Sequence, residues 1–219
     1  MSMYWLLILV TLALGMGASG YVKMQFKKYS TTRSATGLTG AQAAAQMLAA
    51  QGIRDVKITR GNEGQDHFDP RSNTIALSPS VFDSCSITAC STACHEAGHA
   101  CQYAQNYMPL TLRTAIWPVA NFASNIWMIL LFAGVFLYMN QLIDIAIIMY
   151  AAVVVFQVVT LPVEFNASHR ALNYMKSINL PQGEVSSSYS VLRACALTYV
   201  AAALASLLQL VWLLGIRRD

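Results

Sequence analysis

Four long apolar runs are the feature that most limits how this chain can fold. They cover residues 5–22, 116–139, 142–163 and 194–215. Each run is close to the roughly 20 residues that a helix needs to cross a bilayer. Charged residues make up only 11% of the chain, whereas a soluble domain carries about a quarter. The runs predict a mostly α integral membrane protein with about four transmembrane helices, the middle two joined as a hairpin by Asn140 and Gln141.

The first run is predicted to be an uncleaved membrane anchor rather than a signal peptide. Its leading residues, MSMYW, lack the positive charges that open a signal peptide. Lys23, Lys27, Lys28 and Arg33 follow the run and would oppose export of the segment behind it.

The Lys and Arg residues also predict the orientation of the chain and its partners. With four spans, segments 23–115 and 164–193 lie on one side, and they hold all 14 Lys and Arg residues except Arg217 and Arg218. Because these residues concentrate in cytoplasmic loops, both segments are predicted to face the cytoplasm. No nucleic-acid partner is expected, since the basic residues flank apolar runs and form no stripe with interleaved aromatics. The lipid bilayer is the expected partner.

The segment between the first two runs holds the only sizeable soluble-looking region. Thr39 is predicted to cap a helix that Gly52 closes. A polar connection, residues 61–72, separates two predicted strands, and a second helix is predicted to begin near residues 84–87. The predicted strands cover residues 56–59 and 73–78. These elements predict a small α+β unit with a short β-sheet.

Residues 95–99, HEAGH, match the H-E-x-x-H motif. Residues four apart on a helix share a face, so His95 and His99 can direct both imidazoles at one metal ion. Glu96 is rotated by about 100° from His95, so it stays off the metal and can accept a proton from a water molecule that zinc acidifies. Gly98 stands in the middle of this helix at a cost of about 1 kcal/mol, which suggests that another backbone or a substrate comes close.

A catalytic zinc ion takes a third protein ligand and keeps one position open. Glu164 is the favoured candidate, because it lies at the end of an apolar span, where an unpaired carboxylate is costly. The alternative for Glu164 is a carboxylate that reaches the interface and pairs with Arg170. His169 is the competing ligand, and with Arg170 it is also a candidate for stabilising the oxyanion of a tetrahedral intermediate. His67 is a ligand, a substrate contact or a surface histidine.

Two further groups of side chains lie near these motifs in the sequence. Ser168, four residues after Glu164, or Asn166 is a candidate for orienting a metal-bound side chain. The chain has five cysteines and no CxxC pair. We interpret the cysteines as small apolar residues of helices rather than as metal ligands.

The chain resembles the membrane-bound neutral zinc metallopeptidases of bacteria, the YugP-like family. The likeness runs over nearly the whole length, through the amino-terminal anchor, DHFDPRSNTIALSPSVF, HEAGHACQ, LPVEFNASHRAL and LTYVAAALASLLQL. HEAGH alone is common to many metallopeptidases, but the order and spacing of all these pieces are specific to this family. The resemblance implies a zinc-dependent peptidase with a zincin-like catalytic unit and one zinc ion per chain. It also implies that His95, His99 and Glu164 are the ligands and Glu96 the general base.

The sequence departs from the wider class of peptidases in which HExxH is followed by a glutamate on a second helix. Members of that class often carry an acidic residue close to this glutamate, where the present chain has Asn166 and Ser168. His169 stands where an arginine is more usual. These differences concern the surroundings of the predicted ligands and not the ligands themselves.

We therefore expect a zinc-dependent metalloendopeptidase in the inner (plasma) membrane of a bacterium, with its catalytic side in the cytoplasm. It would hydrolyse membrane-associated proteins or peptides, with residues 73–78 as an edge strand that pairs with an extended substrate. An intramembrane protease is disfavoured, since the flanks SCSITAC and QYAQNYM are too polar and short for a span. No oligomeric state is predicted. The alternative is a non-enzymatic, zinc-stabilised membrane scaffold or chaperone, which would have no need of Glu96.

The expected segments follow from these assignments. They are a membrane anchor, a catalytic region with the HEAGH helix, a transmembrane hairpin, a third-ligand helix with its loop, and a fourth transmembrane helix with a short tail. In chain order they cover residues 1–22, 23–115, 116–163, 164–193 and 194–219.

Overall fold

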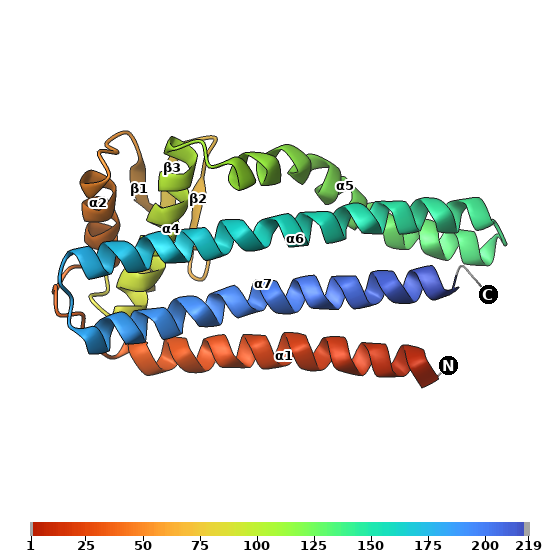
Figure 1. The fold of residues 1–219 in the computed structure, drawn as a ribbon, viewed down its shortest axis with the longest axis horizontal. Coiled ribbons are helices and arrows are strands. Elements are labelled where there is room, and N and C mark those ends of the chain that lie inside the picture. The colour runs from red at the N-terminus through yellow and green to blue at the C-terminus, as the bar shows by residue number, and fades with distance from the viewer. Residues whose placement is uncertain (1, 217–219) are drawn as a thin grey trace. The chain divides into compact units, whose positions relative to one another are not determined.

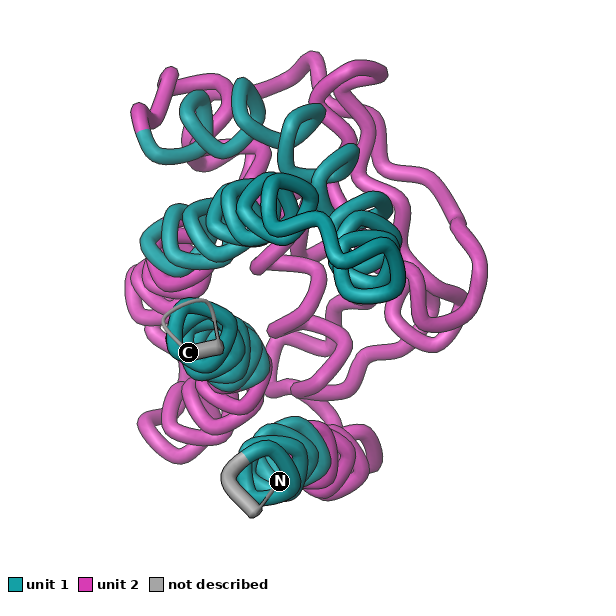
Figure 2. The backbone as a smooth tube through the Cα atoms, turned by 90° about the vertical axis from the view of Figure 1, so that its right-hand side faces the viewer, with its two compact units in different colours: residues 1–18, 109–162, 198–219 teal, residues 19–108, 163–197 magenta. Residues whose placement is uncertain are grey.

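The computed structural model describes residues 2–216 and forms two compact units (Figures 1 and 2). Unit 1 comprises residues 1–18, 109–162 and 198–219, and unit 2 comprises residues 19–108 and 163–197. The helices are α1 (Ser2–Ser30), α2 (Gly40–Ala50), α3 (Pro79–Phe82), α4 (Ile87–Ala104), α5 (Met108–Phe136), α6 (Asn140–Ser177) and α7 (Gln182–Ile216). The strands are β1 (Lys57–Arg60), β2 (His67–Asp69) and β3 (Thr74–Leu77). Arg217 and Arg218, which contribute to the orientation argument, lie outside the described residues.

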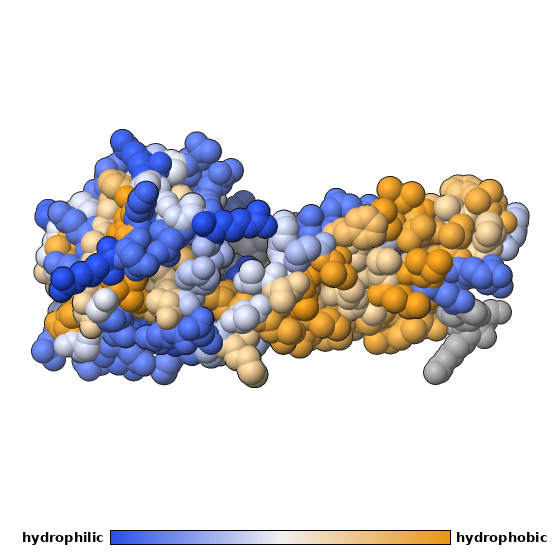
Figure 3. All heavy atoms as spheres, turned by 90° about the horizontal axis from the view of Figure 1, so that it is seen from above, coloured by the Kyte–Doolittle hydropathy of each residue, from blue (hydrophilic) through white to orange (hydrophobic). Residues whose placement is uncertain are grey.

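Unit 1 is built from parts of the long helices α1, α5, α6 and α7. By length and composition, these 4 helices are able to cross a membrane, which confirms the predicted number of spans. Large apolar side chains such as Leu9, Phe132 and Val211 are exposed, and hydrophobic residues are concentrated on the face of the membrane-spanning part that Figure 3 shows. Exposure of this much apolar surface is favourable in lipid and costly in water.

Two of these helices extend well beyond the apolar runs. Helix α6 continues to Ser177 and α7 begins at Gln182, so both include polar segments that the hydropathy pattern left out of the spans. Between them the chain reverses at Asn179, which has a φ of 56°, and at Pro181, which cannot continue a helix. The end of α6 and the start of α7 are therefore set by the backbone geometry of this turn and not by the limits of the apolar runs.

The turn of the predicted hairpin lies slightly earlier than expected. Helix α5 ends at Phe136 and α6 begins at Asn140, so the turn comprises residues 137–139 instead of Asn140 and Gln141. Tyr138 has a φ of 54°, and the N–H of Met139 donates to the carbonyl of Gly134 at 2.9 Å. This backbone hydrogen bond closes the end of α5, and polar residues are not needed for the turn.

Unit 2 contains a 3-stranded sheet with the order β1-β3-β2. β1 pairs with β3 in parallel, and β2 pairs with β3 in antiparallel orientation. Thr39 and Gln42 form a capping box at the start of α2, which confirms the predicted helix. A buried core joins these elements through the apolar faces of α2, α4, β3 and the portions of α6 and α7 in this unit.

The structure corrects two expectations about the sheet. The first is that β2 lies in the stretch predicted to be a polar connection. Asp69 accepts hydrogen bonds from the backbone N–H of Arg71 and from the hydroxyl of Ser72. These hydrogen bonds stabilise the hairpin turn between β2 and β3. The second concerns residues 73–78, which were expected to present a free edge. β3 is the central strand and is paired on both sides, so an added strand has no access to it.

Helices α4 and α6 come into direct backbone contact at Gly98 of α4. A Cβ atom at this position would lie 2.6 Å from the carbonyl oxygen of Ala167 in α6. This contact confirms that the glycine allows another backbone to come close. The side of α4 that carries Gly98 therefore packs directly on the backbone of α6.

We predict that Gly98→Ala separates α4 from α6 and destabilises the protein by about 1–3 kcal/mol, as overpacking in a well-packed core does. The measurement is thermal unfolding of the detergent-purified variant. Gly183→Ala is the matched control, because a Cβ there has no atom within 4 Å. Equal unfolding temperatures for the two variants would contradict the role of the Gly98–Ala167 contact.

Candidate metal centre

Two helices of unit 2 supply the side chains of the centre. Helix α4 begins after Ser86, whose hydroxyl accepts a hydrogen bond from the backbone N–H of Ala89. Most of α4 is buried, including Ala93, Ala97 and Ala100, so small residues let the neighbouring elements pack against it. The helix places His95 and His99 on one face, as the four-residue spacing predicts.

The carboxylate of Glu164, on α6, lies between the two imidazoles. Its Oε2 is 3.2 Å from Nε2 of His95 and 3.5 Å from Nε2 of His99. The candidate ligand atoms of the three residues all lie within 4.8 Å of one another. The two rings meet edge to face, with their centroids 4.7 Å apart. The structure therefore brings together the three residues predicted as ligands.

The three side chains fit a zinc ion. Their exposed fractions are 12% for His95, 10% for His99 and 3% for Glu164, so the group is shielded from water. Two imidazole nitrogens and one carboxylate oxygen are a donor set that catalytic zinc takes, with a fourth position left for water or substrate. The Nε2 atoms of both histidines lie near Oε2 of Glu164. Their Nδ1 atoms form hydrogen bonds with other side chains.

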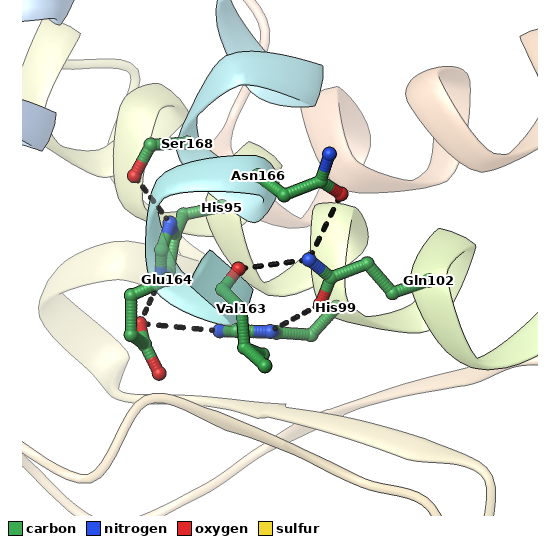
Figure 4. A network of polar contacts seen from close by, with 7 residues as sticks. All are labelled: His95, His99, Gln102, Val163, Glu164, Asn166 and Ser168. Atoms are coloured by element: carbon green, nitrogen blue, oxygen red, sulfur yellow. Dashed lines mark hydrogen bonds and ion pairs between the residues drawn. The ribbon is translucent and has the colours of Figure 1, made fainter. Parts of the chain in front are cut away.

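The Nδ1 atoms are held by separate side chains, as Figure 4 shows. Ser168 places its hydroxyl 3.1 Å from Nδ1 of His95, and Gln102 places Oε1 3.1 Å from Nδ1 of His99. With a neutral imidazole bound to metal through Nε2, Nδ1 carries the proton and donates it to these oxygens. Ser168, one of the two predicted orienting residues, is thus in contact with a ligand.

Gln102 connects the histidine helix to the glutamate helix. Its Nε2 donates to the backbone carbonyl of Val163 at 2.8 Å and to Oδ1 of Asn166 at 3.0 Å. The side chain is fully buried, and every polar atom of its amide has a partner. Because Val163 directly precedes Glu164, the amide fixes both His99 and the backbone beside the third predicted ligand (Figure 4).

Sequence reasoning missed this role of Gln102. The signal is its position three residues after His99 in HEAGHACQ, which places both on one helical face. A glutamine inside an otherwise small and apolar helix needs a hydrogen-bond partner when it is buried. The partner is on a distant helix, so the sequence pattern alone does not identify it.

Glu96 lies next to His95 on α4 and is buried. It is not one of the three residues whose ligand atoms converge. Burial lowers the pKa of His99, but the hydrogen bond that its imidazolium donates to Glu164 and the negative charges of Glu96 and Glu164 outweigh burial and raise that pKa. The negative charge of Glu96 therefore helps to raise the pKa of His99, although Glu96 is not one of the three converging residues.

The other predicted site residues lie away from this group. His169 is exposed, because a step of five residues from Glu164 rotates it by about 140° around α6. Arg170 donates from Nε to Oδ1 of Asn166 at 2.7 Å and from Nη1 to Oε1 of Gln105 at 2.6 Å. His67 lies on β2, with Nδ1 2.9 Å from the carbonyl of Gln65. The oxyanion role of His169 and Arg170 remains a prediction.

The cysteines of α4 are buried thiols. Burial raises the pKa of Cys90 to about 11, and it also raises the pKa of Cys94 and of Cys101. These thiols stay protonated at neutral pH, whereas a thiolate is needed for metal binding or nucleophilic attack. Their environment fits the interpretation of these residues as small apolar side chains.

Comparison with known proteins agrees with the chemistry of this centre. The family model described as "Putative neutral zinc metallopeptidase" matches residues 4–218. A protein of Bacillus subtilis (strain 168), named "Putative membrane protease YugP", is 43% identical over 207 residues, which are 93% of this chain and 92% of that protein. No solved structure matches the chain.

We predict that Gln102→Met lowers zinc affinity by about 10- to 100-fold, as the loss of a partner of a metal ligand does. The substitution removes the acceptor for His99 and both bonds to α6 while it keeps the volume of the side chain similar. Zinc affinity is measured by competition with a chromophoric chelator. Gln105→Met is the control, since the amide of Gln105 contacts Arg170 and no ligand. Equal affinities for the two variants would contradict the orienting role of Gln102.

We also predict that zinc affinity falls as the pH is lowered through the pKa of His99. Zinc and the proton compete for Nε2, and zinc needs the neutral imidazole. Because the pKa is raised in the metal-free protein, affinity starts to fall at a higher pH than for a histidine with the ordinary pKa of about 6.5. Chelator competition between about pH 5 and pH 8 measures this loss. An affinity that stays constant over this range would contradict the prediction, and His169→Ala should behave as the unmodified protein does.

Proposed function

Since this chain belongs to the neutral zinc metallopeptidase family, we propose that it is a zinc-dependent, membrane-bound endopeptidase of membrane-associated proteins or peptides. The observation that carries the proposal is the convergence of His95, His99 and Glu164. Glu96, inside the same motif, supplies the carboxylate that a zinc-dependent hydrolase needs as a general base in addition to the metal ligands. The apolar helices α1, α5, α6 and α7 support the membrane location.

The three converging side chains would hold one zinc ion per chain, the histidines through Nε2 and Glu164 through Oε2. When bound, zinc supplies a Lewis acid that makes water a nucleophile near neutral pH. Ser168 and Gln102 keep the imidazoles in the orientation and tautomer that this role needs. Because these contacts exist before substrate arrives, little reorganisation is required during the reaction.

Glu96 is proposed to act as the general base. Its carboxylate takes a proton from the attacking water as the new C–O bond forms at the peptide carbonyl. The same carboxyl group then gives the proton to the nitrogen of the leaving amine as the C–N bond breaks. The burial of Glu96 keeps bulk water away from this proton transfer.

Strand β2 is the proposed docking edge for an extended substrate. It is an outer strand of the sheet, so its second edge is not paired with β3. The ring of Phe68 lies 5.8 Å from the ring of Tyr103, which stands one turn after His99 on α4. A substrate strand added to β2 would gain main-chain hydrogen bonds without any particular side-chain sequence. This assignment replaces residues 73–78, which contain the central strand β3.

The proposed location is the inner (plasma) membrane of a bacterium, with the catalytic side in the cytoplasm. The support is the distribution of Lys and Arg, which are concentrated in segments 23–115 and 164–193. The alternative function, a zinc-stabilised scaffold or chaperone, would keep the ligands but would not depend on Glu96. A single substitution at Glu96 therefore separates the two functions.

We predict that Glu96→Gln retains zinc but lowers hydrolysis by about 10²- to 10⁴-fold, because it removes the proton acceptor alone. Glu164→Ala is expected to lose zinc and activity together. The metal content of each detergent-purified variant is measured beside cleavage of a fluorogenic membrane peptide.

His169→Ala is the matched control on α6, since its exposed side chain lies outside the ligand group; this variant should keep its zinc. Retention of both zinc and hydrolysis by Glu96→Gln would exclude the general-base role. Retention of zinc by Glu164→Ala would exclude the third ligand.

A further inference from the structure

Unit 1 contains a large cavity among α1, α5, α6 and α7. Its volume is about 620 Å³. Leu131, Phe132 and Val153 contribute apolar walls, and Trp127 and Trp212 also line it. This volume lies within the range of about 300–1,000 Å³ that is usual for ligand-binding clefts in proteins. None of the residues assigned to the metal centre lines the cavity.

Two hydroxyl side chains, of Thr and Ser, and two amide side chains, of Gln, also line the cavity, and the two kinds differ in their hydrogen bonds. The hydroxyl of Thr11 donates to the carbonyl of Leu7 at 3.0 Å, and the hydroxyl of Ser206 donates to the carbonyl of Ala203 at 2.9 Å. These two residues are satisfied by their own helices. Gln157 and Gln209 have no hydrogen bond to any other residue in the described part of the chain.

Unpaired amides in a membrane-spanning region demand a partner. Gln157 and Gln209 are both half-buried, and hydrocarbon offers no hydrogen bonds to an amide. A lipid acyl chain would fill the apolar part of the cavity and leave both amides unpaired. Water would pair with the amides and leave the apolar walls wet. An occupant that suits both must combine apolar side chains with hydrogen-bonding groups.

We propose that this cavity binds a membrane-spanning segment of another polypeptide, preferentially one with a polar side chain in the bilayer. Such a segment packs its apolar residues against Phe132 and Val153 and pairs its polar group with Gln157 or Gln209. Ala202 and Ala205 of α7 also line the cavity, and small residues let a second helix approach closely in lipid. The proposal rests on the proposed function, because it gives the peptidase a means of selecting membrane proteins as substrates.

The test measures binding of synthetic peptides by the full chain in phosphatidylcholine vesicles, with a chelator present so that no peptide is cleaved. One peptide is a helix of about 20 leucines, and the other has a single central asparagine. Energy transfer from the protein's tryptophans to a dansyl group on the peptide, displaced by unlabelled peptide, gives each dissociation constant. The expected result is about 3- to 10-fold tighter binding of the asparagine peptide.

Variants locate the preference within the cavity. Gln157→Leu combined with Gln209→Leu should abolish the preference, and Ala205→Trp should weaken binding of both peptides by filling the space. Gln141→Leu is the matched control, because Gln141 is exposed on α6 and does not line the cavity; it should keep the preference.

Equal binding of both peptides by the unmodified protein would overturn the proposal without any variant, and so would an unchanged preference in the double variant. The absence of saturable energy transfer would indicate that lipid occupies the cavity and would also overturn it. Failure of the proposed function would be visible separately, as a chain without zinc or hydrolysis, because peptide binding is measured without either.

Discussion

The packing of α4 directly on α6 at Gly98 determines the geometry of the metal centre. At this point the carbonyl of Ala167 occupies the place where a side chain would begin, 2.6 Å from the position of a Cβ atom. The histidines are one residue or one turn away on α4, and Glu164 is one turn away on α6. A shift of either helix by the width of a methyl group would move the carboxylate out of reach of the two imidazoles.

The buried amide of Gln102 shows how polar groups stabilise this arrangement. Burying an amide is unfavourable unless its donors and acceptor are all paired. Here the acceptor meets His99, and the donors meet Val163 and Asn166. The network is complete only when α4 and α6 are in register, so the cost of an incomplete network favours the one packing that also assembles the ligands.

The spanning helices combine two kinds of environment within continuous elements. Helix α6 has an apolar part, with Val155 and Val158 exposed, and a part that supplies Glu164 and Ser168 to the centre. Polar residues also occur within the membrane-spanning region. Gln157 and Gln209 line the cavity of unit 1 without a hydrogen-bond partner among residues 2–216, so unit 1 also carries polar groups that another molecule would pair.

Local sequence patterns were enough to predict the number of spans, the zinc motif and a candidate for the third ligand. Hydrophobic run length reports how many helices can cross a bilayer, and the four-residue spacing of His95 and His99 is a property of any helix. Both are local quantities. Glu164 was the favoured candidate for the third ligand because a carboxylate at the end of an apolar span needs a compensating partner.

The residues that surround the predicted ligands and the order of the strands could not be predicted in this way, because they depend on how distant segments pack. Ser168 was one of two candidates, and its contact with His95 depends on the rotation of α6 against α4. His169 and Arg170 follow Glu164 closely in the sequence, yet helix rotation directs them away from the ligand group. Strand order depends on which strands pair, and β3 is central because β2 forms from a stretch that resembles a loop. These features follow from contacts between residues far apart in the chain, which a local pattern does not encode.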